Sequence, residues 1–312
     1  MKYLILTLFF VVGTHVSAQK LASNFNTSRN WMNNKKEVYF AAGATQFLGD
    51  LGGRDQVGTQ KSLADIDWAA TRFGFGAGYR FRFHPFWATS TNLYFGLLSG
   101  DDAHTNELIR NSRNLHFRSQ LIELSQRIEF ILFANEQVGA RYSLKGVKGM
   151  RSKADQIYLF TGIGGFFFNP QMRIDGDWTN LHPLKTEGQG LPGGPDEYSR
   201  FSASIPMGIG FKVALRGEWR IGMEVSYHLT FTDYIDDVSG NYYDRDYLME
   251  NIGPESAYAS NPAKANHNWF DRGQQRGNPD DNDTYFLANI VLTRNLGKKM
   301  PRGPKWRGRP KY

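Results

Sequence analysis

Three polar residues, Glu224, Ser226 and His228, alternate along one stretch and include the residue types of a hydrolase. A hydroxyl, an imidazole and a carboxylate can together activate a nucleophile if they come within hydrogen-bond distance. The same spacing also places three ordinary polar residues on one face of a strand. We favour this second interpretation, because the sequence contains no H-E-x-x-H, G-x-S-x-G or phosphate-loop motif. We therefore expect a protein that is not an enzyme and uses no cofactor.

The stretch that carries these residues alternates strictly between apolar and polar or small side chains. In 201–215 and again in 219–231 every second residue is apolar, and Arg216-Gly217-Glu218 separates the two runs. A period of two over this length predicts strands, and the short separation predicts a β-hairpin. The runs exceed the usual five or six residues of a soluble strand and match a membrane-spanning strand of roughly 9–11 residues. A two-layer soluble sandwich would give the same alternation with its apolar face turned inward, so the rest of the chain must decide.

The same pattern recurs along the chain and predicts eight strands. They are expected at 37–48, 72–83, 87–98, 117–133, 156–168, 201–215, 219–232 and 284–296. Counted in order, every odd-numbered connection is long, whereas two of the three even-numbered ones are tight turns. Long external loops and short periplasmic turns are typical of outer-membrane barrels. We therefore predict an all-β fold, an eight-stranded antiparallel transmembrane β-barrel with long extracellular loops, at residues 36–296 in the cell outer membrane.

The inner face of this barrel is expected to be charged. The residues assigned to it are Arg72, Arg80, Arg82, Glu123, Arg127, Glu129, Lys212, Arg220 and Glu224. An eight-stranded barrel is only wide enough for its own side chains or one small ligand. Because a buried unpaired charge is costly, most of these residues should form ion pairs, and we favour a filled interior over a conducting pore.

The N-terminal residues read as a secretory signal peptide. Lys2 precedes an apolar run at 3–12, and Val16-Ser17-Ala18 resembles a cleavage site. We expect residues 1–18 to be the signal peptide and 19–35 a periplasmic leader. The sequence has no cysteine, which excludes disulfides and thiolate metal sites. An exported chain of this kind is expected to bind outer-membrane lipid and no nucleic acid.

Two basic segments should face the periplasm. One is the unusually long inner connection, with Arg141, Lys145, Lys148, Arg151 and Lys153, and the other is the tail at 297–312, with Lys298, Lys299, Arg302, Lys305, Arg307, Arg309 and Lys311. The seven charges of the tail equal the net charge of +7, so the rest of the chain is balanced. A Pro- and Gly-rich basic tail is not expected to fold alone. These twelve residues are the candidate partner-binding residues, and a solvated tail is the alternative.

The last outer loop, Asp233–Asp283, is acidic and rich in aromatic residues. Clustered carboxylates can hold Ca²⁺, but their spacing matches no EF-hand loop. We therefore favour solvated acids over a metal site. The aromatic residues indicate that the loop folds on itself or meets a partner.

Several loop sequences resemble one family of outer-membrane barrels. They are Gly49-Asp50-Leu51, Gly100-Asp101-Asp102, Arg110-Asn111, Arg113-Asn114-Leu115, the segment Thr186-Glu187-Gly188-Gln189-Gly190-Leu191-Pro192-Gly193 and the segment Thr232-Asp233-Tyr234-Ile235-Asp236-Asp237-Val238-Ser239-Gly240. With them, residues 36–296 resemble the PorG-like component of the Bacteroidota type IX secretion system, which serves protein export and, in gliding species, motility.

The resemblance implies a non-enzymatic barrel that anchors a periplasmic ring, formed by a lipoprotein and its partner, to the outer membrane. The two basic segments would be suitable docking surfaces for that ring. A stand-alone structural barrel and a lipid-modifying outer-membrane enzyme are the alternatives.

Overall fold

The fold is described from a computed structural model, which covers residues 31, 35–51, 68–105, 107–135, 155–215, 218–264 and 268–296. Its strands are β1 (Lys36–Leu48), β2 (Arg72–His84), β3 (Trp87–Asp101), β4 (His116–Asn135), β5 (Asp155–Ile174), β6 (Asp177–Asn180), β7 (Phe201–Ala214), β8 (Trp219–Thr230) and β9 (Thr284–Asn295). The short helices are η3 (Asp102–His104), α2 (Leu108–Arg113), η4 (His182–Leu184), α3 (Arg245–Asn251), α4 (Pro254–Ser260) and η5 (Asn268–Phe270). No helix among these residues is long and apolar enough to cross a membrane.

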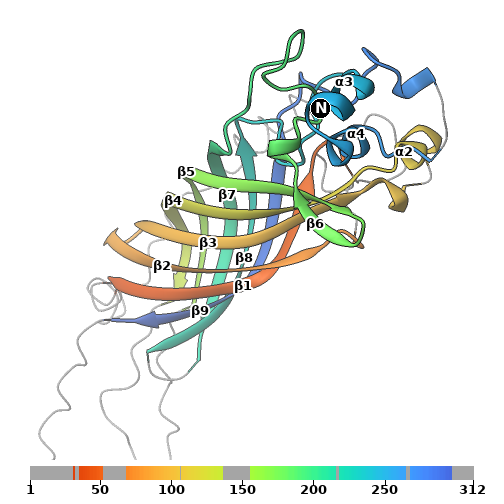
Figure 1. Ribbon diagram of the computed structural model, residues 1–312. Coiled ribbons are helices and arrows are strands. Elements are labelled where there is room, and N and C mark those ends of the chain that lie inside the picture. The colour runs from red at the N-terminus through yellow and green to blue at the C-terminus, as the bar shows by residue number, and fades with distance from the viewer. Residues whose placement is uncertain are drawn as a thin grey trace, which may run out of the picture.

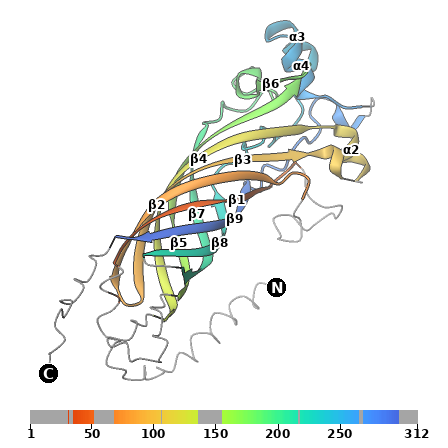
Figure 2. The same ribbon diagram turned by 90° about the horizontal axis from the view of Figure 1, so that it is seen from below.

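The strands form one antiparallel sheet that closes on itself. Their order is β4-β3-β2-β1-β9-β8-β7-β5-β6, and β4 also pairs with β5. This last pairing makes a barrel of eight strands, and β6 pairs with β5 alone. The first and last strands of the barrel meet from Glu37 opposite Asn295 to Leu48 opposite Thr284. Closure removes the unpaired edges that a sheet cannot leave exposed in lipid. The predicted fold class is confirmed, and Figures 1 and 2 show the strands curving around a common axis.

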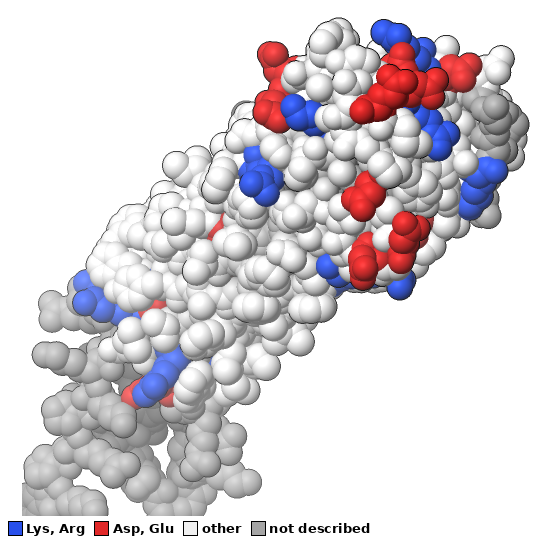
Figure 3. All heavy atoms as spheres, in the orientation of Figure 1, with Lys and Arg blue, Asp and Glu red and all other residues white. Residues whose placement is uncertain are grey.

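The two faces of each strand differ in the way that the alternation predicts. On the outer wall, Phe75 and Leu93 are each 55% exposed and Ile209 is 48% exposed. On the inner face, by contrast, Arg80 and Glu224 are 3% and 4% exposed. Apolar side chains outside and charged side chains inside are the reverse of a soluble sandwich. The exposed belt needs an apolar environment, so the chain is an outer-membrane β-barrel. Figure 3 shows charged residues near the two ends of one face, with a largely uncharged wall between them.

Strand β5 differs from the prediction, which ended it at Phe168 because Asn169-Pro170 follow. The strand instead continues to Ile174, with Pro170 opposite Ser119 of β4. Proline removes one backbone donor, but its carbonyl still accepts a hydrogen bond from the Leu181 N–H at 2.9 Å. Beyond Phe167, where the pairing with β7 ends, β6 takes over as the partner of β5 from Gln171.

The long connections fold into a cap at one end of the barrel. The cap contains α2, α3, α4 and the 3-10 helices, and all of these elements lie in the connections β3–β4, β5–β7 and β8–β9. Figure 1 shows α2, α3 and α4 beyond the same end of the strands. An apolar cluster joins the cap to the barrel mouth, with Ile235 and Val238 of the cap packed with Leu98 and Phe168 of the strands. Of the two expectations for the last outer loop, that it folds on itself is confirmed, and that it meets a partner stays a prediction.

Candidate functional site

The lumen holds a cluster of ion-paired side chains toward the end of the barrel that lies away from the cap. Its members, here called the lumen charge cluster, are Glu37, Arg80, Arg127, Glu129, Lys212, Arg220 and Glu224. They come from β1, β2, β4, β7 and β8, and all are at most 5% exposed. Only closure of the sheet brings these strands to one place, so the cluster is a product of the barrel.

Two residues connect most of this cluster. Glu37 receives Lys212 Nζ at 2.5 Å, Arg80 at 3.2 Å and a further bond from Arg220 Nη1. Arg80 also contacts Glu129 at 2.6 Å and Glu224 at 3.2 Å. Removal of one member would leave the others charged and buried, which typically costs about 3–5 kcal/mol. The prediction of an ion-paired interior is confirmed for these residues.

Tyrosine rings fill the space beside the charges. The Arg80 guanidinium lies 4.6 Å from the ring centre of Tyr158 and 5.2 Å from that of Tyr39. The Tyr158 hydroxyl donates to Glu224, and the Tyr39 hydroxyl accepts from Arg127 at 2.6 Å. The Tyr39 ring also occupies the space above Gly78, where a Cβ atom would lie 2.3 Å from it. The lumen is thus packed with side chains at this level, which argues against a water-filled pore.

Glu37 and these tyrosines were not predicted to face inward. The sequence pattern places Glu37 and Tyr39 on the same face of β1, so the signal was present in the alternation. The assumption that aromatic side chains face lipid concealed it. Arg72 is the opposite error: it was predicted inside but is exposed at the start of β2, where its Nη1 donates to the Ala69 and Thr71 carbonyls. Inward-facing Arg82 bonds the carbonyl of Pro85 at 2.5 Å.

A second polar group lies in the lumen nearer the cap than the charge cluster, and it has the arrangement of a hydrolase triad. His228 Nε2 lies 3.0 Å from Ser226 Oγ, and its Nδ1 lies 2.9 Å from Glu123 Oε2. The carboxylate is therefore Glu123 of β4. Glu224, the carboxylate suggested by sequence spacing, instead joins Arg80 and Arg127 in the charge cluster.

The surroundings of this group favour a structural role. Ser226, His228 and Glu123 are each at most 5% exposed. Glu123 Oε2 also accepts from Ser204 at 2.9 Å and from Tyr285, whose ring stacks on His228 with centres 4.5 Å apart. A hydrolase needs space for a substrate beside its nucleophile and donors aimed at the oxyanion. Here the neighbouring side chains occupy that position.

The cap is held together by two buried arginines. Arg113 bonds both carboxylate oxygens of Asp102 at 2.7 and 2.9 Å and the Arg276 carbonyl at 2.6 Å. Arg276 in turn pairs with Glu187 at 2.9 Å and donates to the Asp237 carbonyl at 2.6 Å. These bonds join the connections β3–β4, β5–β7 and β8–β9. The loop sequences that carry the family resemblance thus form one interlocked unit.

Four acids of the last outer loop are buried, which corrects the expectation of solvated carboxylates. Asp233, Asp236, Asp237 and Asp283 are at most 6% exposed. Asp236 accepts from the Leu51 and Val238 N–H groups at 3.2 and 3.0 Å, and Asp283 accepts from the Ile235 N–H at 2.8 Å. For Asp236 and Asp283, backbone N–H groups of the same loop and of Leu51 in the β1–β2 connection therefore replace water. Among the described residues no group of three acidic or histidine side chains is placed to hold a metal ion.

Burial alters the ionisation of these cap acids. Loss of hydration raises the pKa of Asp237 to about 6, although Arg276 and the hydroxyls of Thr186 and Tyr198 act in the opposite direction. The pKa values of Asp236 and Asp283 are also raised well above their usual range, by burial and by the neighbouring carboxylates. Asp236, Asp237 and Asp283 are therefore less fully ionised at neutral pH than solvated carboxylates.

The predicted partner-binding residues lie outside the described part of the chain. This applies to the five residues of the inner connection, within 141–153, and to the seven of the tail, within 298–311. The proposed signal peptide at 1–18 also lies outside it.

Comparisons with known proteins assign no family to the chain. No family model matches the chain, and no curated protein matches it. Among solved structures it is similar to Ail, the attachment invasion locus protein of Yersinia pestis, with 10% identity, 84% of this chain and 98% of that chain covered, and a TM-score of 0.33. It is similar to the outer membrane protein OprG of Pseudomonas aeruginosa, with 10% identity, 85% and 98% coverage, and a TM-score of 0.34. It is also similar to a major outer membrane protein of Thermus thermophilus, with 9% identity, 83% of this chain and 98% of that chain covered, and a TM-score of 0.32. Likenesses of this size assign no activity and no partner.

Proposed function

We propose that the chain is a non-enzymatic barrel subunit of a type IX protein secretion complex, which anchors periplasmic ring components to the outer membrane. In gliding species the same machine also serves motility. The ring components are a lipoprotein and its partner, and the docking residues are the basic ones within 141–153 and 298–311.

The observation that carries this proposal is the place of the resembling loop sequences in the structure. Arg113, Glu187 and Asp237, which belong to three of those sequences, meet around Arg276 in the cap. Arg113 and Arg276 lie 163 positions apart in the sequence and share a buried hydrogen bond, so the resembling sequences form one buried unit. The packed lumen further supports a role as an anchor, because it argues against passage of a substrate through this barrel.

The proposal is tested by crosslinking and co-purification from intact cells. Deletion of 298–312, or replacement of Arg141, Lys145, Lys148, Arg151 and Lys153 by Gln, should release the periplasmic ring proteins. A matched control neutralises two basic residues of the cap, the half-buried Lys185 and the exposed Arg272, and should leave the complex intact. If the ring proteins still co-purify after both periplasmic changes, the docking proposal is wrong. The chain would then act as a stand-alone structural barrel.

One observation favours a second candidate, a lipid-modifying enzyme: the bonds from Ser226 to His228 and from His228 to Glu123. For this role, purified protein in micelles should hydrolyse or transfer acyl chains, and His228→Ala should abolish the activity. We expect no activity in the unaltered protein or in the His228→Ala variant, because aromatic and hydroxyl side chains surround Ser226, His228 and Glu123.

A further inference from the structure

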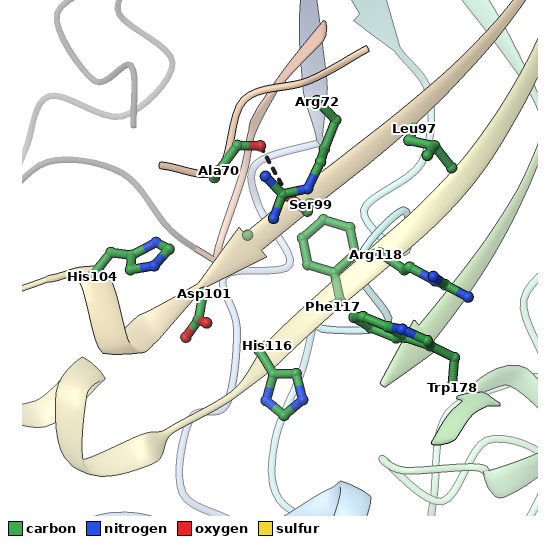
Figure 4. Close-up of a pocket in the computed structure, with 11 residues that line it drawn as sticks. Ala70, Arg72, Leu97, Ser99, Asp101, His104, His116, Phe117, Arg118 and Trp178 are labelled. Carbon is green, nitrogen blue, oxygen red and sulfur yellow. Dashed lines mark hydrogen bonds between the residues drawn. The ribbon is translucent and has the colours of Figure 1, made fainter. Parts of the chain in front are cut away.

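A cavity of about 180 Å³ lies at the extracellular end of the outer wall, between β2, β3, β4 and β6. Charged and aromatic side chains line it: Arg72, Arg118, His104, His116, Asp101 and Trp178. Two guanidinium groups and two imidazoles therefore line the cavity together with one carboxylate. Figure 4 shows these side chains, with Arg118 beside Trp178 on one side of Phe117 and Arg72 on the other.

The β5–β6 hairpin sets one side of the cavity. Its turn, Asp175-Gly176, has φ angles of 50° and 99°, and an Asp-Gly pair with two positive φ values is a favoured hairpin turn. The turn brings Trp178 opposite Arg173, and the Trp178 ring then lies 4.0 Å from the Arg118 guanidinium carbon. A ring stacked on a guanidinium holds it in place while its N–H edge remains available for an anion.

The two arginines keep donors for a ligand. The Arg118 Nε donates to Gln171 at 2.9 Å, and the bonds of Arg72 to the Ala69 and Thr71 carbonyls both use Nη1. Among the bonds of the described residues, the remaining guanidinium donors are thus not engaged. His116 Nε2 accepts from the Arg173 N–H at 3.2 Å, so its ring proton is on Nδ1, which is a further donor.

The height of the cavity on the barrel indicates where its ligand comes from. Arg118 and Ile122 lie on the same outer face of β4, four residues apart, which corresponds to about 13 Å along a strand. Ile122 is 45% and Leu124 58% exposed, so the lipid-facing belt begins just below the cavity. An aromatic residue such as Trp178 is typical of this interface level. A molecule bound here would have acyl chains against the belt and its polar group in the cavity.

We propose that this cavity binds the phosphoryl group of a phosphorylated lipid in the outer leaflet. Arginine forks match the oxygens of a phosphate and form charge-assisted hydrogen bonds to it. Arg72 and Arg118 would hold the phosphoryl oxygens, and the apolar belt below would contact the acyl chains. The proposal concerns the outer wall and is independent of the periplasmic docking role.

Binding of defined lipids to the purified full-length protein in micelles, followed by native mass spectrometry, tests this site. Diphosphoryl lipid A should bind, and its dephosphorylated form should bind about tenfold or more weakly, as expected for loss of hydrogen bonds to a charged group. Arg72→Gln with Arg118→Gln should weaken binding of the diphosphoryl lipid to the same degree. Migration on unheated gels verifies that this variant is a folded barrel.

Arg294→Gln provides the matched control. Arg294 also lies over a tryptophan, Trp219, at 5.5 Å, but at the opposite end of the barrel. Its loss should leave lipid binding unchanged. Equal binding of both lipids, or unchanged binding by the Arg72 and Arg118 variant, would overturn the proposal. Displacement of the lipid by millimolar inorganic phosphate would also overturn it, because the site would then serve a soluble anion.

Discussion

Glu37 is one of the two residues, with Arg80, that connect the lumen charge cluster. Its two oxygens receive Lys212, Arg220 and Arg80, and all four side chains are almost fully buried. Because three cations share one carboxylate, its removal affects as many ion pairs as removal of Arg80 would, and more than removal of Lys212 or Arg220 would.

Replacement of Glu37 by Gln should therefore destabilise the barrel strongly. We expect a loss of about 3–5 kcal/mol in the free energy of unfolding, as for other buried pairs with one partner removed. Urea unfolding in micelles measures this change. Glu218→Gln is the control, because Glu218 lies 3.8 Å from an exposed Arg294 and should contribute less than about 1 kcal/mol. Equal effects of the two substitutions would show that the cluster is not a stabilising centre.

The stability of the cap should depend on pH through Asp237, and the direction of this dependence follows from the shift of its pKa. Its pKa is raised from 3.8 to about 6 in the folded cap, chiefly by burial. Stability from this group is therefore present below pH 4 and is lost as the pH rises through 6. The loss is on the order of 3 kcal/mol, since each pKa unit corresponds to about 1.4 kcal/mol. Hydrogen exchange of cap amides, corrected for intrinsic rates, should show more frequent opening at pH 7 than at pH 5.

Asp237→Asn should flatten this profile between pH 5 and 7. The backbone tolerates the change, because φ is 64° at this residue and asparagine adopts that region readily. Asp236 and Asp283 also have raised pKa values, so the variant would retain a dependence of the same sign and its profile should be less steep rather than level. Asp246→Asn, at an exposed site, should leave the profile unchanged. A variant profile as steep as that of the unaltered protein would contradict the assignment to Asp237.

At the scale of elements, the cap and the barrel should respond separately to substitution. Arg276 joins Glu187, the Asp237 carbonyl and the Ser260 carbonyl, whereas each barrel strand is held by its neighbours. The cap loops are not paired by continuous rows of backbone hydrogen bonds as the barrel strands are. Loss of Arg276 should therefore make all of these loops more mobile.

Arg276→Ala should make the cap sensitive to limited proteolysis while the barrel remains folded. The expected signs are cleavage within 233–283 and retention of the compact form on unheated gels. Arg272→Ala is the control, because Arg272 is 69% exposed and its pair with Asp244 at 2.9 Å is a surface one. A cap that stays resistant without Arg276 would mean that apolar packing alone holds it.

The elements also show which parts of the fold the sequence could predict. Strict alternation is a local signal, so it located the eight barrel strands and their lipid-facing sides, including Phe75, Met207 and Ile221. The cap depends instead on contacts such as Arg113 to Arg276, which no local pattern encodes. Burial of Asp236 and Asp283 was missed for the same reason. The spacing of Ser226 and His228 was enough to predict that they share one face of a strand. The carboxylate that contacts His228 is Glu123, which lies on another strand and could not be predicted from spacing.

For the whole molecule, the central claim is that the apolar stripes contact lipid while the charged stripes pair inside a closed cylinder. The sequence has no cysteine, so single cysteines can be introduced and spin-labelled without background. Suitable positions are Leu93 and Ile209 on the belt, with Glu250 on the exposed cap as the control.

The deciding measurement is the accessibility of these labels, in reconstituted bilayers, to oxygen and to a water-soluble nickel complex. Labels at Leu93 and Ile209 should collide with oxygen and hardly with nickel, whereas the label at Glu250 should show the reverse. High nickel accessibility at Leu93 and Ile209 would contradict the account, because the belt would then face water.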